Sequence, residues 1–475
     1  MRELVLPRVM RCFYINAVHR ITLIALLVAV AGSAFAESEW KPKCNMDKQL
    51  FPSLILATAT VRPEDDDDEP DPQVLGDPYG LLGISFKAPA KAADVKVTVR
   101  ENGLMNASSW SGKLQKSGAH YFIAPKINYK FDQLRRVRQQ GPLNVTFAVE
   151  VNGKAAGEQT ETLNVRSVND CPWAVLEVEE TIADDTPPAE EKSKESAEQR
   201  KARNAARAKS EEGTVLGRLA AQQAEDSEDD SEQEDEEEEE EDGEEATTAA
   251  NEWEDLGWMG AAYVNESSPV LDEILKEALD GGWTNAFAGY QREPDDVLRE
   301  VLAIWAALQR RGNRYSSVTG TPGGSERVHS QHIRFTDESL TNKQANCADG
   351  SVLFCSILRK LGLRTFLVYV PGHMYMGVYL KPGSDEHIAI ETTMLGNPAS
   401  KPSIVKELKS LHANLPRAQR EKAEWQTFAA AVEAGTKDLR QHAAKFTDEE
   451  NVDYQIVEID EARRDGIMPI AYEKY

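Results

Sequence analysis

A long, highly charged stretch, residues 180–250, limits what this chain can fold into. It includes Pro187 and Pro188, continues through a segment rich in Ala, Lys, Glu and Arg, and ends in residues 225–245, where 17 residues are acidic and none is basic. Such a composition cannot bury enough apolar surface to offset the entropy lost on ordering. The sequence therefore predicts a disordered charged linker between two folded units. Its segment 190–213 could form a polar helix, but it has no apolar stripe to dock with.

The charge of the chain is concentrated rather than spread. Its formal net charge is −26, and residues 225–245 together with the run "EDDDDEPD" at 64–71 carry almost all of it. The remaining residues are nearly neutral, so the sequence contains no basic footprint for nucleic acid, and we expect no nucleic-acid partner. We interpret the acidic runs as solvated spacers; binding of calcium or of a basic partner is the alternative.

The N-terminus has the pattern of an export signal. Residues 1–20 carry four arginines and one acid, and residues 21–36, "ITLIALLVAVAGSAFA", form an apolar run that closes on a small-x-small pattern at Ala36. This predicts a signal peptide over residues 1–36 with cleavage near Ala36, and hence a periplasmic or secreted protein. The run is short for a bilayer span, so we expect no stable membrane span once the signal is removed; a single anchor is the alternative.

The first unit, residues 40–175, is predicted to be all β. Apolar residues recur with period two or in short runs at 53–61, 81–88, 94–102, 119–125, 143–153 and 159–168, and turn-forming residues separate the runs. About seven short strands without a convincing amphipathic helix are typical of an immunoglobulin-like β-sandwich. Cys44 precedes the first run and Cys171 follows the last, so in an oxidising compartment these two cysteines are candidates for a disulfide.

The second unit, residues 251–475, has helical periodicity. Residues 269–282 and 294–312 repeat apolar side chains at helical spacing, and the second of these helices should begin at Pro294 and end at Gly312. Residues 313–346, with four glycines and prolines between 320 and 324, are predicted to be a long binding loop. Residues 400–475 should add helices and an edge strand that cover the second unit.

Cys347 falls at the start of the next predicted helix, which Gly362 closes. Asn346 stands at the N-cap position and Asp349 lies in the first turn. Unpaired amide groups and the positive end of the helix dipole favour a thiolate at Cys347. Cys355, two turns further on, has no such advantage and is predicted to be a small core residue.

Two strands should follow this helix and supply partners for the thiol. Residues 365–380 are β-branched and aromatic, with a predicted kink or bulge at Pro371-Gly372 just before His373. Glu391 ends the next alternating run and could accept the second imidazole N–H. Cys347, His373 and Glu391 therefore form a candidate set of nucleophile, general base and orienting acid.

The residues from 345 to 380, followed by "IETTML", resemble the transglutaminase-like superfamily of papain-type thiol enzymes, and in particular its bacterial secreted members. The resemblance covers residues 290–396 and rests on a cysteine at a helix start, an apolar helix, a Gly-His pair on one strand and an acid on the next. It implies an α+β fold and acyl transfer through a thioester, with Cys347, His373 and Glu391 as the catalytic residues. The superfamily's usual third residue is aspartate, and Asp385, in a turn, is the weaker alternative to Glu391.

Several functional alternatives remain open from the sequence. We expect hydrolysis of a peptide or isopeptide bond in a protein or peptide of the cell envelope, with amine transfer, which crosslinks proteins, as the second choice. A non-catalytic envelope-binding module is the alternative outside enzymes. Gln331 is the candidate for a second oxyanion donor, ahead of Gln344. The sequence leaves the oligomeric state undetermined.

A metal site is the least favoured reading. His329, His332 and His373 are the residues that could form one, but they lack the helix and acid context of a zinc hydrolase. We therefore expect neither a metal nor another cofactor.

Overall fold

The computed structural model of the chain describes residues 39–61, 72–89, 91–115, 119–177, 214–216, 218–219, 252–317, 325–397, 402–448 and 451–470. The predicted signal peptide, the acidic run 64–71 and nearly all of the predicted linker, including residues 225–245, lie outside these residues. In the part of the chain that is described, no helix combines the length and apolar character that crossing a membrane requires.

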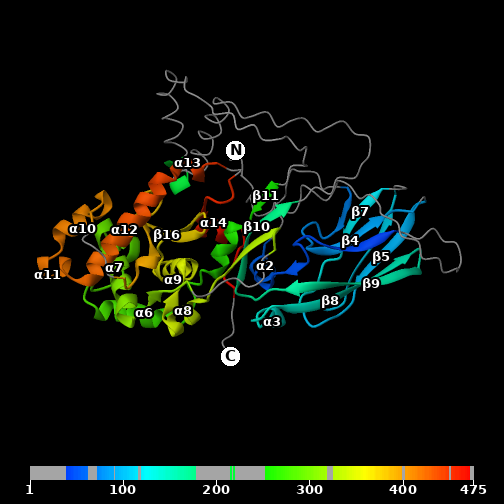
Figure 1. Ribbon diagram of the computed structural model, residues 1–475, viewed down its shortest axis with the longest axis horizontal. Helices are drawn as coiled ribbons and strands as arrows, with labels where there is room; N and C mark the ends of the chain where they lie inside the picture. The colour runs from blue at the N-terminus through cyan, green and yellow to red at the C-terminus, as the bar shows by residue number, and fades with distance from the viewer. Residues whose placement is uncertain are drawn as a thin grey trace, which may run out of the picture.

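The N-terminal region is β-rich, and two of its sheets share one apolar core (Figure 1, right). The first sheet has the strand order β1 (Trp40–Cys44), β4 (Leu82–Lys87), β7 (His120–Ala124) and β3 (Val74–Gly76). The second has the order β2 (Gln49–Leu50), β9 (Lys154–Val165), β8 (Gly141–Val151), β5 (Ala93–Val99) and β6 (Ser108–Leu114). The period-two pattern explains the packing, because alternate side chains point inward from each strand. Val95, Val97 and Val99 of β5, for example, are all buried.

The strand predicted at residues 53–61 is wrong. Residues Pro52–Ala57 form the helix α2, which Pro52 begins at a position where a missing amide N–H costs nothing. The hydroxyl of Ser53 donates to the carbonyl of Asp170 at 2.6 Å, and Leu54 packs in the core of the second unit. A second short helix, α3 (Phe131–Leu134), also interrupts the region. Contacts with distant residues thus decide the conformation of an apolar run that local periodicity left ambiguous.

The two units are joined by a shared sheet. The strand β10 (Asp170–Glu177) leaves the N-terminal region and pairs with β11 (Glu252–Asp255) on one side and with β13 (Val328–His332) on the other. The expected boundary at residue 175 therefore falls inside a strand of a sheet that both units build. In Figure 1, β10 and α2 lie between the β-rich region and the helices of the second unit.

The second unit is mixed α and β around an antiparallel sheet. The sheet has the order β17 (His387–Ile390), β16 (His373–Tyr379), β15 (Thr365–Val370) and β18 (Gln455–Glu458). Its helices are α6 (Leu271–Asp280), α7 (Pro294–Arg311), α8 (Thr336–Asn342), α9 (Cys347–Lys360), α10 (Lys409–Asn414), α11 (Arg417–Arg420), α12 (Ala423–Gln441), α13 (Ala443–Phe446) and α14 (Ile459–Arg464). Short 3-10 turns, η1 (Gly257–Tyr263), η2 (Gly289–Gln291), η3 (Thr392–Met394) and η4 (Lys406–Leu408), connect them.

The helix that carries Cys347 lies against one face of this sheet. Met374, Met376 and Val378 of β16 share a core with the apolar residues of α9. The alternate residues Tyr375 and Tyr379 belong to a separate cluster on the other face, with Leu439 of α12 and Phe446 of α13. The alternation of side chains along β16 therefore divides the interior of the second unit into two cores.

Two local predictions for this unit need correction. Pro371 and Gly372 form a tight turn between β15 and β16 rather than a kink, because Val370 pairs with His373 and Gly372 has a φ of 69°, which a type II turn requires. The predicted loop 313–346 contains β13, α8 and the parallel pair β12 (Arg314–Tyr315) and β14 (Gln344–Ala345). The partner of β13 is β10, far away in sequence, so this pairing depends on the tertiary fold.

Candidate active site

Cys347 is the first residue of α9, as predicted. The side chain of Asn346 accepts the amide N–H of Asp349 at 2.8 Å, and the carboxylate of Asp349 accepts the amide N–H of Asn346 at 3.0 Å. These two bonds form a capping box that satisfies amides otherwise left without partners. The N-cap predicted at Asn346 is therefore confirmed, and the start of the helix is fixed.

A buried ion pair anchors this helix start to the chain that follows β13. Asp349 is fully buried, and its carboxylate accepts the backbone N–H of Arg334 at 2.7 Å and the Arg334 guanidinium at 2.9 Å. Burial raises the pKa of the Asp349 carboxyl, and the bonds from Arg334 and Asn346 oppose that rise. Arg334 was missed by the sequence reasoning, since nothing in its local sequence signals a partner in α9.

The thiol of Cys347 is surrounded by groups that favour its ionised form. Burial opposes ionisation most strongly, but the hydrogen bond and charge of His373 and the backbone N–H groups of Met374 and Ala348 outweigh it and lower the pKa of the thiol. Cys347 as a whole residue is 9% exposed. Cys355, by contrast, is fully buried, and burial raises its pKa to about 12, as expected for a core thiol.

His373 stands between the thiol and the acid. As the first residue of β16, it places its Nε2 atom 2.6 Å from Oε2 of Glu391, which leaves Nδ1 for the sulfur of Cys347. Hydrogen bonds to Cys347 and Glu391 raise the pKa of the imidazole to about 10, although burial lowers it. Both shifts favour a thiolate on Cys347 and an imidazolium on His373.

Glu391 is held at the end of β17 by the turn that follows. Its Oε1 atom accepts the amide N–H of Thr393 at 3.0 Å and the Thr393 hydroxyl at 2.6 Å, which leaves Oε2 for His373. Burial opposes ionisation, but the bonds from His373 and Thr393 lower the pKa of the carboxyl below its ordinary value. Thr393 was not predicted, although a threonine two residues after an acid at a strand end is a turn signal.

Two close approaches tie the acid to neighbouring helices. The backbone N–H of Glu391 donates to the carbonyl of Ala431 in α12 at 3.0 Å, and Gly435 lets the helix come close, because a Cβ there would lie 2.8 Å from the backbone of Ala389. On the other side, the hydroxyl of Thr392 would lie only 2.8 Å from a Cβ added at Gly350 of α9. The acid is thus fixed against the helix that carries the cysteine.

The other predicted site residues fall into different surroundings. Gln331 lies on β13 opposite Cys171, and among the described residues no hydrogen bond joins its side chain to Cys347. Its role as an oxyanion donor stays a prediction. Asp385 forms an ion pair with Arg218 at 3.4 Å, so Glu391 is the carboxylate that the structure brings to His373.

The predicted disulfide between Cys44 and Cys171 is wrong. Both residues are free thiols. Cys44 lies on β1 of the first sheet, and Cys171 lies on β10, which has turned away to pair with β13. Burial raises the pKa of both thiols, that of Cys44 to about 11. Because the chain leaves the β-rich region before Cys171, the two ends of the region do not bring these cysteines together.

The three histidines considered for a metal site have separate partners. His329 stacks on Trp253 with ring centroids 4.1 Å apart, His332 contacts the carboxylate of Asp170 at 3.0 Å, and His373 belongs to the candidate triad. In the part of the chain described here, no group of three or more His, Cys, Asp or Glu side chains is arranged to hold a metal ion.

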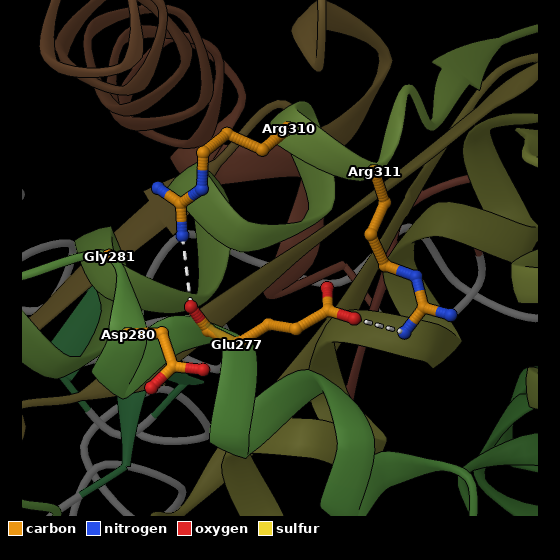
Figure 2. Close-up of a pocket in the computed structure, with 5 residues that line it drawn as sticks. All are labelled: Glu277, Asp280, Gly281, Arg310 and Arg311. Atoms are coloured by element: carbon orange, nitrogen blue, oxygen red, sulfur yellow. Dashed lines mark hydrogen bonds and ion pairs between the residues drawn. The ribbon is translucent and has the colours of Figure 1, made fainter.

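A surface pocket on α6 and α7 is a separate feature (Figure 2). The guanidinium of Arg310 donates to the backbone carbonyl of Glu277 at 3.0 Å, and that of Arg311 lies 3.2 Å from the Glu277 carboxylate. Asp280 and Gly281 complete the lining. None of these residues belongs to the candidate triad.

Comparison of the sequence with models of protein families and with curated proteins found no match.

Proposed function

We propose that this chain is an exported thiol acyl-transfer enzyme, most simply a cysteine peptidase that cleaves peptide or isopeptide bonds through a thioester on Cys347. The observation that carries the proposal is the arrangement of three side chains: His373 interacts with both the thiol of Cys347 and the carboxylate of Glu391, and the thiol lies at a helix start. A buried structural thiol does not need an ionised imidazole beside it, whereas a nucleophile does.

The proposed reaction follows from the two ionised groups. The Cys347 thiolate attacks the carbonyl carbon, a C–S bond forms, and the carbonyl oxygen takes the negative charge. The amide N–H of Cys347, at the first helical position, has no acceptor within the helix and is available to this oxygen. His373 gives its proton to the departing nitrogen as the C–N bond breaks. It then takes a proton from water, which attacks the thioester and releases the acid and the thiolate.

The finer fold assignments belong to the same proposal. We propose that the N-terminal β-rich region is immunoglobulin-like and that the second unit is transglutaminase-like. The position of a cysteine-bearing helix against strands that carry the histidine and the acid supports the second assignment. A periplasmic or secreted location and a protein or peptide substrate of the cell envelope complete the proposal, and they rest on the export signal predicted from the sequence.

The test is selective alkylation of Cys347, followed by mass spectrometry of the intact mature chain. At neutral pH, iodoacetamide should add once per chain, because the other described cysteines, Cys44, Cys171 and Cys355, all have raised pKa values. His373→Ala should slow this addition by roughly tenfold or more, the equivalent of one pKa unit. Labelling that is unchanged in His373→Ala, or that falls on another cysteine, would contradict the proposal.

A second experiment separates hydrolysis from amine transfer. The mature chain is incubated with envelope proteins, with and without a fluorescent primary amine, and Cys347→Ala serves as the control. Cleaved fragments that need Cys347 support a peptidase, whereas the incorporation of the amine supports a crosslinking enzyme. If neither product depends on Cys347, the chain is better described as an envelope-binding protein.

A further inference from the structure

The sheet formed by β17, β16, β15 and β18 has one face turned away from α9, and we call this its outer face. Aromatic side chains are prominent on it. Its buried side chains come from the four strands and from the ends of α12 and α13: Phe366, Val368, Tyr375, Tyr379, Ala389, Leu439, Phe446 and Ile456. All of these side chains are buried, so neighbouring segments cover this face of the sheet. We refer to these residues as the outer sheet surface.

A short piece of the predicted linker covers this surface. Val215, Leu216 and Leu219 belong to the same cluster, and Val215 is completely buried. Their spacing places all three on one side of a helical turn, seen as the isolated short green turn beside α13 in Figure 1. The prediction of a disordered linker over residues 180–250 is therefore wrong for residues 214–216, 218 and 219.

Polar contacts fix the direction and register of this segment. The backbone N–H of Val215 donates to the hydroxyl of Tyr379 at 2.9 Å, and that hydroxyl donates in turn to the buried carboxylate of Glu458. Arg218 reaches Asp385, which lies in the turn between β16 and β17. Both members of this ion pair are partly exposed, so it adds specificity rather than much affinity.

We propose that the outer sheet surface is a peptide-docking site whose occupant is residues 214–219 of this same chain. The site accepts a helical turn with aliphatic residues at its first, second and fifth positions and an arginine at its fourth. The proposal does not depend on the thiol chemistry, because the surface residues that contact the segment are not members of the triad, although Tyr375 of this surface lies beside His373 with ring centroids 6.2 Å apart.

The segment should bind this surface reversibly, because the net free energy of docking is small. Only three aliphatic side chains, Val215, Leu216 and Leu219, are buried, and the ordering of their backbone offsets much of that gain. Because the segment belongs to the same chain as the surface, its effective concentration there is high, so the site is occupied within the chain. A free peptide of the same sequence should therefore compete poorly with the native segment and bind well once that segment is disabled.

The experiment uses a fluorescent peptide that spans residues 210–222 and follows its anisotropy with the full mature chain. The wild-type chain should bind it weakly, and Val215→Asp/Leu219→Asp should bind it at least roughly tenfold more tightly because the surface is vacated. A peptide that carries the same two substitutions should not bind. Phe131→Asp, which changes an exposed apolar residue of the β-rich region, is the matched control and should behave like the wild type.

A milder variant guards against misfolding of the double variant. Arg218→Asp alters only an exposed ion pair and opposes Asp385 with a like charge, so it should raise peptide binding a few-fold without loss of the folded state. If neither variant binds the peptide more tightly than the wild type, the docking site does not exist. Alkylation of Cys347 measured in parallel reports separately on the proposed enzyme activity.

Discussion

Glu391 is one methylene longer than the aspartate that the family resemblance implies, and its surroundings use that length. Thr393 holds one carboxylate oxygen and His373 the other. Glu391→Asp would withdraw the carboxylate from one of these partners, which weakens the imidazolium and returns the proton to the thiol. We expect the rate of Cys347 alkylation at pH 7 to fall by about tenfold, the equivalent of one pKa unit.

Glu391→Gln is the matched comparison for this prediction. It keeps the length of the side chain and an acceptor oxygen but removes the charge. The two variants therefore separate the effect of side-chain length from the effect of the carboxylate charge. If Glu391→Asp alkylates as fast as the wild type while Glu391→Gln is slow, the charge matters and the 2.6 Å contact with His373 does not.

The pH dependence of the site follows from the two shifted pKa values. A thiol with a lowered pKa is ionised above that pKa and loses its charge as the pH falls through it, so alkylation should become fast at a lower pH than for an ordinary thiol. Cleavage also needs the proton on His373, which is lost as the pH rises through about 10. We expect alkylation to rise and then level off with pH, and substrate cleavage to follow a bell-shaped curve.

His373→Ala provides the control for this profile. Without the imidazolium, the midpoint of the alkylation curve should move up towards the ordinary range of a thiol. An unchanged midpoint would mean that the helix amides alone ionise Cys347, and the histidine would then have no part in activating it.

The sequence identified the three residues of the candidate triad but not the residues that hold them in place. The sequence marks three residues by their type, their position at element ends and their order along the chain: Cys347, His373 and Glu391. It does not mark Thr393 and Arg334, because a hydroxyl or a guanidinium has many uses and only the fold decides which one applies. The disulfide prediction failed for a related reason: it assumed that residues flanking a domain lie side by side.

At the scale of elements, the contact between α12 and the end of β17 fixes the position of Glu391. Gly435 permits contact between the helix and β17, and a methyl group there would meet the backbone of Ala389 and Ile390 at 2.8 to 2.9 Å. Gly435→Ala should push the strand end and the acid away from His373. We expect Cys347 alkylation to slow by roughly 10- to 100-fold, the usual cost of misplacing a catalytic group by about 1 Å.

Gly103→Ala is the matched control, since a Cβ at that position meets nothing within 4 Å. Both variants should keep the far-ultraviolet circular dichroism of the wild type. A Gly435→Ala chain that alkylates normally would show that the strand end can absorb the displacement, and α12 would then be only a cover.

Long amphipathic helices were predictable and short elements were not. The stripe in α7, its start at Pro294 and its left-handed Gly312 appear where the periodicity places them. The helix α2 was missed because it depends on a contact with β10, and the pairing partner of β13 is the same distant strand. Local patterns report the face of an element, whereas tertiary pairing decides whether a short run becomes an element at all.

For the whole molecule, the two units are packed together through a shared sheet and buried polar contacts. Fully buried Arg166 bonds to the carboxylate of Asp170 at 3.0 Å, and the other oxygen of that carboxylate contacts His332 of β13. Asn169 adds a bond from its side chain to the carbonyl of Ile333 at 2.9 Å. The chain then passes directly from Ile333 to Arg334, which anchors the start of α9. Contacts from the end of the β-rich region therefore help to hold the helix start that carries Cys347.

This coupling predicts how the molecule unfolds when Asp170 is removed. Burial opposes the ionisation of Asp170, but the bonds from His332 and Arg166 outweigh it and lower the pKa of the carboxyl. Asp170→Ala leaves the buried Arg166 guanidinium without its counter-charge and should reduce the free energy of unfolding by about 3 to 5 kcal/mol. Because the shared sheet links both units, calorimetry of the mature chain should show a single transition that moves to lower temperature as a whole.

The pH dependence makes this last prediction specific. A carboxyl with a lowered pKa contributes stability that is present above the unfolded pKa and is lost as the pH falls through the folded one. The difference between the wild type and Asp170→Ala should therefore be constant near neutral pH and shrink only in acid, where Asp170 itself takes up a proton. Asp132→Ala, which breaks an exposed ion pair with Arg135, should change little at any pH. Two separate transitions, of which only one shifts, would mean that the units unfold independently and that β10 does not couple them.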